Sequence, residues 1–240
     1  MRIIHCEDYG RLSVEAGALV LGEIERRRDS LLCAATGRSP SGLYAELARK
    51  AETDPALFGH LRVVKLDEWG GVPPTDPGSC EHYLRTRLLD PLGVPSERYL
   101  AFSAMTPDPS AECERIRTEL ERRGPIDVCV LGLGVNGHIG FNEPGPSLVP
   151  HCHVAQLSES SRSHTMVRSL GSAPRFGLTL GVREILASRR IVLLVAGEGK
   201  RDVALRLLSG EVSTTLPASF LWLHGNVDCL IDRHLAPPPR

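Results

Sequence analysis

A histidine and a glutamate stand close together in the glycine-rich stretch LGLGVNGHIGFNEPG, residues 131–145. Beside a carboxylate, an imidazole is held in one tautomer and its pKa is raised, so His138 and Glu143 could form an acid–base pair. Asn136 could hydrogen-bond the same group or a substrate. Glycines allow positive φ angles and a close approach of the backbone to a ligand. The stretch therefore predicts a catalytic loop, with a phosphate cradle or a simple tight turn as the alternatives.

Two acids follow one another at the end of the apolar run LRVVKLDEW, residues 61–69. If the strand persists, Asp67 and Glu68 point to opposite faces, so only one of them can face a substrate. A carboxylate partly shielded from water suits proton abstraction next to a carbonyl, which makes Asp67 a candidate general base. The alternative is a helix cap or a surface acid.

Two further turns carry groups that bind anions. TGRS, residues 36–39, offers hydroxyls, backbone N–H groups and the start of a helix, and a helix N-terminus attracts negative charge. Lys200 ends the turn GEGK and can reach a phosphate as a point charge. Neither turn is a P-loop, because G-x-x-x-x-G-K-[ST] is absent. Taken alone, the first could be a turn capped by Ser39 and the second a solvated lysine. Together they predict a phosphate clamp, formed by Thr36, Gly37, Arg38, Ser39 and Lys200.

The elements that would position these groups alternate between apolar strands and helices. The strands are continuous apolar runs, which predicts an α/β fold with a mostly parallel, Rossmann-like sheet and helices on both faces. Ligands bind beyond the carboxyl ends of the strands in such a sheet, so the four motifs should share one rim. The strands concerned lie within residues 31–37, 61–69, 126–134 and 189–200.

We expect one domain over residues 1–240, because no clean linker, repeat or low-complexity block is present. The first helix is expected over residues 13–28, with Ser13 as its N-cap. The irregular stretch of about residues 144–175 is expected to act as a lid.

Composition and charge exclude several classes of protein. The chain of 240 residues has a formal net charge of −1, so a polyanion such as nucleic acid is not an expected partner. No apolar run approaches the ~20 residues that span a bilayer, so no membrane partner is expected either. The start, MRIIHCEDYG, lacks the apolar core of a signal peptide.

The seven cysteines are scattered without a C-x-x-C pair, which is typical of a reducing compartment. We therefore expect a cytoplasmic protein. The run His151-Cys152-His153 contains possible metal ligands, but adjacent ligands without a second cluster are weak support for a zinc site. No metal is expected.

LGLGVNGHIGFNEPG, LDEW and GEGK, taken together, resemble the glucosamine-6-phosphate deaminase family of isomerising amino-sugar-6-phosphate deaminases. The pattern LG-x-G-x-[ND]-GH-x-x-x-NEP is highly specific, and the resemblance runs in order over nearly the whole chain. Three stretches are more similar to the galactosamine-6-phosphate isomerase branch: LDEW, DPGSCEHYL and VSTTLPASFLWLH. The resemblance implies a three-layer α/β sandwich, shared with phosphogluconolactonases and ribose-5-phosphate isomerases.

The resemblance also implies catalytic roles. Asp67 matches the base that moves a proton between C2 and C1 of the open-chain sugar. His138 matches the residue that helps to open the pyranose ring, and Glu143 matches its carboxylate partner. Asn136 occupies the third position of this relay, where some members of the family carry aspartate.

For the phosphate, the resemblance implies the turns at residues 36–39 and Lys200. It also implies an arginine from the lid, for which Arg168 is the better match and Arg162 the competing one. Allosterically activated members carry basic residues beyond the NEP loop that this chain does not match. Allosteric activation and the accompanying hexamer are therefore not expected, and a monomer or small homo-oligomer is.

The implied reaction converts galactosamine 6-phosphate and water to tagatose 6-phosphate and ammonia, without a metal or organic cofactor. Deamination of glucosamine 6-phosphate to fructose 6-phosphate is the alternative, because the two sugars differ only at C4 and no single residue reads C4. A 6-phosphogluconolactonase-like hydrolase shares the fold but moves no proton between C1 and C2. A non-catalytic sugar-phosphate sensor would keep Thr36 and Lys200 without needing Asp67, His138 and Glu143 together.

Overall fold

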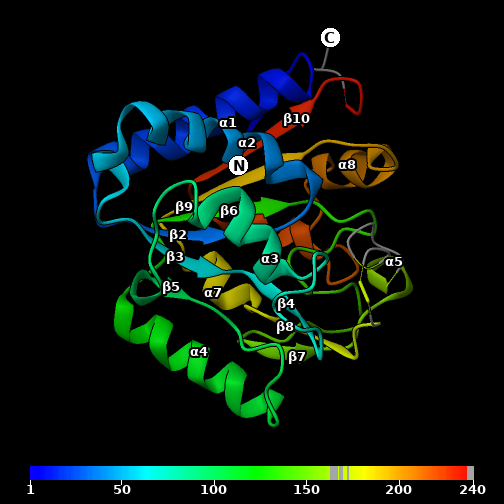
Figure 1. Cartoon of the computed structure of the whole chain (residues 1–240). Helices are drawn as coiled ribbons and strands as arrows, with labels where there is room; N and C mark the ends of the chain where they lie inside the picture. The colour runs from blue at the N-terminus through cyan, green and yellow to red at the C-terminus, as the bar shows by residue number, and fades with distance from the viewer. Residues whose placement is uncertain (163–166, 168–169, 172, 237–240) are drawn as a thin grey trace.

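Within the described residues, 1–162, 167, 170–171 and 173–236, the core of the protein is a seven-stranded parallel sheet (Figure 1). This computed structural model orders the strands β1-β10-β9-β6-β2-β3-β5, and all neighbouring pairs run parallel. The mostly parallel sheet predicted from the sequence is confirmed. The strands are β1 Arg2–Cys6, β2 Leu31–Ala34, β3 Arg62–Lys65, β5 Tyr99–Leu100, β6 Val128–Gly132, β9 Arg190–Val195 and β10 Val227–Asp232.

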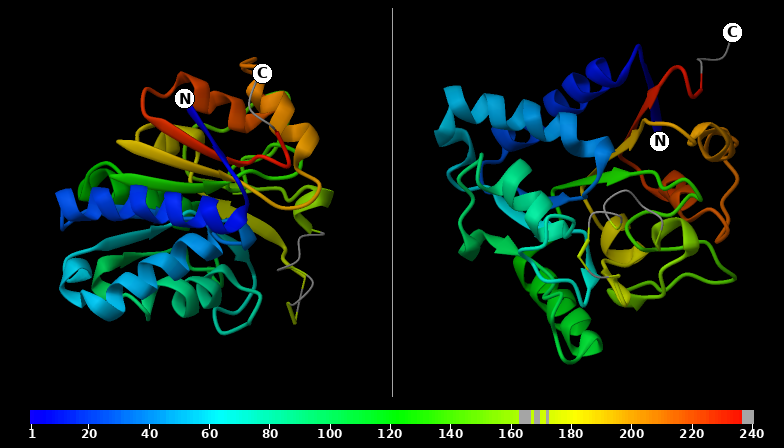
Figure 2. Two further views of the ribbon diagram at one scale, coloured as in Figure 1. Left: turned by 90° about the horizontal axis from the view of Figure 1, so that it is seen from above. Right: turned by 45° about the vertical axis from the view of Figure 1, so that its right-hand side comes forward.

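Helices cover both faces of this sheet. Two lie side by side on one face, α1 (Tyr9–Arg26) and α2 (Arg38–Thr53) (Figure 2). The other face carries α4 (Pro109–Arg123), α7 (Val182–Leu186) and α8 (Arg201–Leu208). All of β2 is buried, because Leu32 and Ala34 pack toward α1 and α2 while Leu31 and Cys33 pack toward the other layer. The three-layer α/β sandwich is therefore confirmed.

A second, antiparallel sheet lies beside the first and has the order β4-β8-β7 within the described residues. Its strands are β4 Asp67–Gly70, β7 His153–Ala155 and β8 Phe176–Thr179. The run LRVVKLDEW, predicted as one strand, is thus split between two sheets at Leu66. The backbone of Leu66 bridges them, since its N–H donates to Ala34 at 3.2 Å and its carbonyl accepts from Leu180 at 2.9 Å. Asp67 is the first residue beyond this crossing.

The start of α1 differs from the prediction. The helix begins at Tyr9, and Asp8 is its N-cap, accepting from the N–H of Arg11 at 2.8 Å. Ser13 is buried inside the helix, where its hydroxyl donates to the carbonyl of Tyr9 at 2.7 Å. Serine makes this bond to the preceding turn when it lies mid-helix, so Ser13 as the N-cap was wrong. The strand β1 was also not predicted from the sequence.

The remaining elements are short. The described residues contain no helix that is long and apolar enough to cross a membrane. All seven cysteines are free thiols, and all but Cys152 are buried. The short helices are η1 Pro55–Phe58, α3 Cys80–Leu84, η2 Arg85–Leu89, η3 Ser96–Arg98, α5 Glu159–Arg162 and η4 Pro217–Leu223.

Candidate active site

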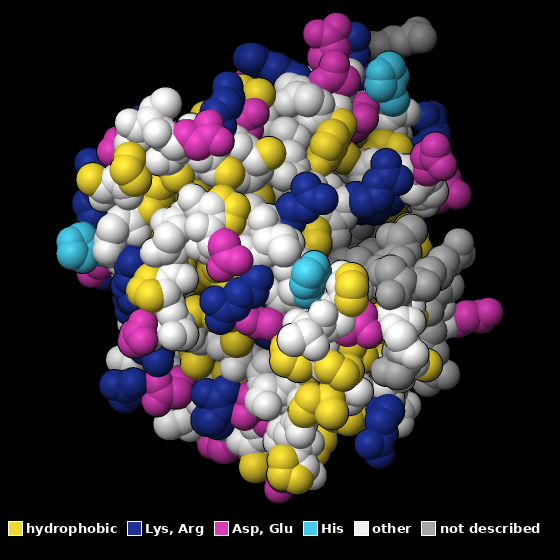
Figure 3. Space-filling view, in the orientation of Figure 1, with side chains coloured by type: hydrophobic (Ala, Val, Ile, Leu, Met, Phe, Trp, Pro, Cys, Tyr) yellow, Lys and Arg dark blue, Asp and Glu magenta, His cyan; other side chains and the backbone are white. Residues whose placement is uncertain are grey.

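A cavity of about 350 Å³ opens beyond the carboxyl ends of the central strands. Its wall contains residues from all four predicted turns, which follow β2, begin β4, follow β6 and follow β9. The space-filling view shows basic side chains beside a hollow on this face (Figure 3). The predicted residues on the wall are Thr36, Gly37, Arg38, Ser39, Asp67, His138 and Lys200.

One end of the cavity is built for an anion. Gly37 is the N-cap of α2 with φ 107°, a conformation that glycine adopts without strain, and no side chain caps the helix. The alternative in which Ser39 caps this helix was therefore wrong. The N-terminal N–H groups of α2 remain for another acceptor, and the helix dipole favours a negative one.

Lys200 reaches the same end from the turn after β9. Its ammonium donates to the hydroxyl of Ser39 at 3.0 Å. Burial, and after it the positive charge of Arg38, lowers the pKa of Lys200 to about 8. An anion between these two cations would neutralise them and restore the lysine pKa, which is what a phosphate group does in such a site.

Asp67, the first residue of β4, lies on the wall of the same cavity. The residue is 7% exposed, and its Oδ1 is buried without a hydrogen-bond partner among the described residues. Burial, and after it the charge of Glu68, raises the pKa of Asp67 to about 7 against the opposing charge of Lys65. A carboxylate with a free oxygen and a pKa near neutrality can take and return a proton.

The glycine-rich loop places His138 on the wall with two polar residues behind it. Glu143 Oε2 accepts from the side-chain amide of Asn136 at 2.9 Å and lies 3.5 Å from His138 Nδ1. The backbone N–H of His138 donates to Asn136 Oδ1 at 3.2 Å. Gly134 makes room for the imidazole, because a Cβ there would lie 2.4 Å from the ring. The loop is thus shaped around the histidine.

Two serines that follow β7 in the chain were not predicted as site residues. Ser158 donates through its hydroxyl to Glu143 Oε1 at 3.0 Å, and the hydroxyl of Ser161 donates to the same oxygen. Burial tends to raise the pKa of Glu143, but the contacts with His138, Ser161 and Asn136 outweigh it and hold the pKa at about 2. Ser161 also lines the cavity. The only sequence signal was the serine-rich run SESSRS, which has no periodicity.

The arginine expected to meet the phosphate, Arg168, lies outside the described residues, and so does the side chain of Arg162. The run from His151 to His153 makes other contacts: His151 Nδ1 lies 2.8 Å from Glu184 Oε1, and His153 Nδ1 lies 2.8 Å from the carbonyl of His151. No group of three or more metal-ligating residues is found in the described part of the chain.

The family model for glucosamine-6-phosphate isomerases/6-phosphogluconolactonase matches residues 15–229. The chain is 42% identical to the "Putative deaminase AgaI" of Escherichia coli (strain K12), over 94% of this chain and 90% of that protein. It is 37% identical to glucosamine-6-phosphate deaminase 1 of Bacillus subtilis (strain 168), over 98% of both chains.

Solved structures agree with these matches. A monomeric glucosamine-6-phosphate deaminase superposes with a TM-score of 0.93 at 36% identity, covering 98% of this chain and 99% of that one. A 6-phosphogluconolactonase from Trypanosoma cruzi superposes with a TM-score of 0.80 at 18% identity, covering 98% and 95%. At that identity the second likeness concerns the fold alone.

Proposed function

Because the chain belongs to the family of glucosamine-6-phosphate isomerases and 6-phosphogluconolactonases, we propose that it is an isomerising deaminase that acts on galactosamine 6-phosphate. The enzyme class, an amino-sugar-6-phosphate deaminase, follows from the family and its similar members. The choice of the galacto sugar as substrate is more specific than the enzyme class. It is supported by the stretches LDEW, DPGSCEHYL and VSTTLPASFLWLH. The products would be tagatose 6-phosphate and ammonia.

The observation that carries the mechanism is the presence of an anion-binding group and a buried, partly unsatisfied carboxylate on one cavity wall. Lys200, Ser39 and the N-terminus of α2 form the end suited to the phosphate. Asp67 keeps a buried oxygen without a partner among the described residues, and its pKa of about 7 allows proton transfer in both directions near neutral pH. A sugar phosphate held at the first end would present its C1–C2 bond to the second.

His138, oriented by Glu143, moves the proton of the C1 hydroxyl to the ring oxygen as the pyranose opens. Asp67 takes the proton from C2 and returns it to C1, while one proton of the C2 ammonium passes to the oxygen of the C1 aldehyde. A hydroxyl at C1 and a protonated C=N bond at C2 result. Water adds to C2, the C–N bond breaks, and ammonia leaves as the ketone forms. The residues supply only proton transfer and positioning.

The direct test measures ammonia release from galactosamine 6-phosphate and from glucosamine 6-phosphate, side by side and without added metal. A higher kcat/KM for the galacto sugar is expected. The gluco sugar is the second candidate, favoured by the named activity of the Bacillus subtilis relative and of the monomeric solved structure. A preference for it would overturn the galacto assignment and keep the mechanism. No ammonia from either sugar would refute the deaminase proposal, and thermal stabilisation without turnover would then indicate a sensor.

The assembly is proposed from a relative. The solved structure that superposes with a TM-score of 0.93 is that of a monomeric deaminase. We propose a monomer or small homo-oligomer for this chain, which light scattering coupled to size-exclusion chromatography measures directly. A hexamer in that experiment would contradict the proposal.

A further inference from the structure

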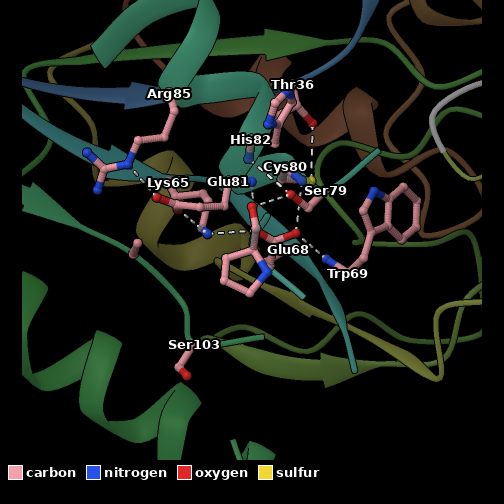
Figure 4. Close-up of polar contacts among 12 residues, drawn as sticks. Thr36, Lys65, Glu68, Trp69, Ser79, Cys80, Glu81, His82, Arg85 and Ser103 are labelled. Atoms are coloured by element: carbon pink, nitrogen blue, oxygen red, sulfur yellow. Dashed lines mark hydrogen bonds and ion pairs between the residues drawn. The ribbon is translucent and has the colours of Figure 1, made fainter. Parts of the chain in front are cut away.

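Two close sequence neighbours of Asp67, Lys65 and Glu68, form a buried ion pair. Lys65 and Glu68 are 1% and 0% exposed, and the ammonium of Lys65 lies 2.7 Å from Glu68 Oε2 (Figure 4). The same ammonium lies 2.9 Å from Glu81 Oε2. Neither Lys65 nor Glu68 belongs to the cavity wall. A buried ion pair adds little net stability, because apolar residues of similar size often stabilise a protein equally well.

Every oxygen of the Glu68 carboxylate is used to hold the backbone. Oε1 accepts from the N–H groups of Trp69 at 2.9 Å and Cys80 at 3.0 Å. Oε2 accepts from the N–H of Glu81 at 2.9 Å. Trp69 follows Asp67 by two positions on β4, whereas Cys80 and Glu81 form the first turn of α3. Glu68 therefore ties the strand that carries the proposed base to the start of a helix elsewhere in the chain.

The other contacts of α3 lead to the anion-binding turn. The hydroxyl of Tyr83 donates to the carbonyl of Gly37 at 2.7 Å and lies 2.8 Å from the hydroxyl of Ser41. The hydroxyl of Thr36 donates to the sulfur of Cys80 at 3.4 Å. The path from Asp67 through Glu68 and α3 thus ends at both residues that begin this turn. These contacts join the strand that carries Asp67 to the anion-binding turn.

We propose that Lys65 and Glu68 are positioning residues that hold the Asp67 carboxylate in register with the anion-binding turn, through α3. Lys65 balances the negative charge of Glu68 at full burial, where an unpaired charge would be strongly destabilising. Glu68 then fixes α3. The inference rests on the proposed role of Asp67 as the base, and it adds how the protein places that base.

Besides the hydrogen bonds of Glu68, the charges of Lys65 and Glu68 also act on Asp67. Glu68 raises the pKa of Asp67 and Lys65 lowers it, after the larger effect of burial. The other ionisable groups around this carboxylate come from the strands, helices and loops that surround it. After burial, the charge of Asp67 contributes to the raised pKa values of Cys33 and Tyr44. Cys80 and Glu81 belong to α3, and the cavity wall adds Arg38, His138 and Lys200.

Two substitutions separate charge from geometry. Glu68→Gln removes the negative charge and leaves one oxygen for three backbone donors, so kcat should fall about 10- to 100-fold. With Lys65 still present, the acid limb of the kcat/KM profile should move to lower pH. Glu68→Asp keeps the charge but is too short to reach α3, so kcat should fall while the acid limb stays in place. Inorganic phosphate should bind more weakly to both variants, as measured by calorimetry.

Tyr99→Phe is the matched control, because the hydroxyl of Tyr99 donates to Glu81 Oε2 at 2.9 Å, whereas the hydrogen bonds to Glu68 come from other donors. It should lower the melting temperature and leave both the phosphate affinity and the acid limb unchanged. If the Glu68 variants behave like Tyr99→Phe, with lowered melting temperature alone, the pair is merely structural and the proposal is wrong. A Glu68→Gln profile without the shift also overturns it. Glu68→Asp retains the charge that Lys65 pairs with, so the phosphate test remains should the Gln variant not fold.

The test distinguishes this inference from the proposed function. Phosphate affinity depends on the link through α3 and not on the chemistry of Asp67. If Asp67→Asn kept wild-type turnover, the assignment of the base would fail while the phosphate result still measured the link. If Asp67→Asn were inactive and the Glu68 variants bound phosphate normally, the function would stand and the positioning role would be lost.

Discussion

Two carboxylates of the same cavity region, Asp67 and Glu143, are treated in opposite ways by their surroundings. Asp67 is buried with an oxygen that has no partner among the described residues, and its pKa is raised to about 7. Glu143 accepts hydrogen bonds on both oxygens and its pKa is lowered to about 2. One acid is therefore able to exchange a proton near neutral pH, while the other stays ionised. Paired acids whose environments push their pKa values apart divide the roles of proton carrier and charge partner.

The largest effect is expected from the acid that exchanges the proton. Asp67→Asn cannot accept a proton, so turnover should fall by about 10²- to 10⁴-fold. Ammonia release at saturating sugar phosphate measures it, with Asp90→Asn, an exposed aspartate, as the control. Retention of most of the turnover would show that Asp67 is not the base.

The same substitution sharpens the comparison through stability. The pKa of Asp67 in the folded protein is about 7, above the ordinary value of 3.8, so between about pH 4 and 7 the native state holds a proton that the unfolded state has lost. Wild-type stability from this group therefore falls as pH rises through that window. Asp67→Asn should be more stable than the wild type by up to about 4 kcal/mol above pH 7, and by almost nothing near pH 4. If the gain in stability of Asp67→Asn did not grow with pH, the raised pKa of the buried Asp67 carboxyl would be contradicted.

Glu143 should show the reverse dependence. Its folded pKa is depressed, so its contribution to stability is present above about pH 4.5 and is lost as pH falls through about 2. Glu143→Gln should thus destabilise the protein at neutral pH and reduce turnover about 100-fold, because His138 loses its charged partner. Thermal melts and ammonia release check both parts. Glu121→Gln, on the exposed side of α4, should change neither.

At the anion end the expected effect is smaller. Lys200→Met should weaken the binding of inorganic phosphate about 10- to 100-fold, since a charge-assisted contact is lost. Because the pKa of Lys200 is about 8, wild-type affinity should decline as pH rises above that value, and the variant should lack this decline. Lys50→Met is the control, as Lys50 lies in the last turn of α2, near Asp54. Equal losses in the two variants would argue against a clamp at Lys200.

The smallest effect concerns the support of Glu143. Ser161→Ala removes one hydroxyl from Oε1, and turnover should fall about fivefold. The exposed Ser96→Ala should have no effect. An unchanged rate in Ser161→Ala would mean that Asn136 and Ser158 suffice to hold the carboxylate.

The sequence predicted the convergence of four turns because that follows from parallel strands alone. It predicted that Lys200 meets the turn at residues 36–39, but it did not predict the contacts of Glu68 with α3 or of Ser161 with Glu143. The bonds from Cys80 to Glu68 and from Ser161 to Glu143 join segments 12 and 18 positions apart, and no periodicity marks them. The crossing at Leu66 was also hidden, since the apolar run continues through it without glycine or proline. A local pattern indicates that a strand exists far better than it indicates where the strand ends or which sheet it joins.

The small antiparallel sheet has a consequence for how this enzyme can diversify. Ala155 at the end of β7 pairs with Gly177 in β8, so the stretch between them leaves and re-enters the sheet at neighbouring points. The cost of closing a loop rises only slowly with its length, and such an insertion can lengthen, shorten or change its residues with the ladder intact. Asp67 lies on β4, the third strand, paired with Thr179. Natural or laboratory selection can therefore change the length or sequence of this connection without breaking the ladder that holds Asp67, provided that Ser158 and Ser161 are kept.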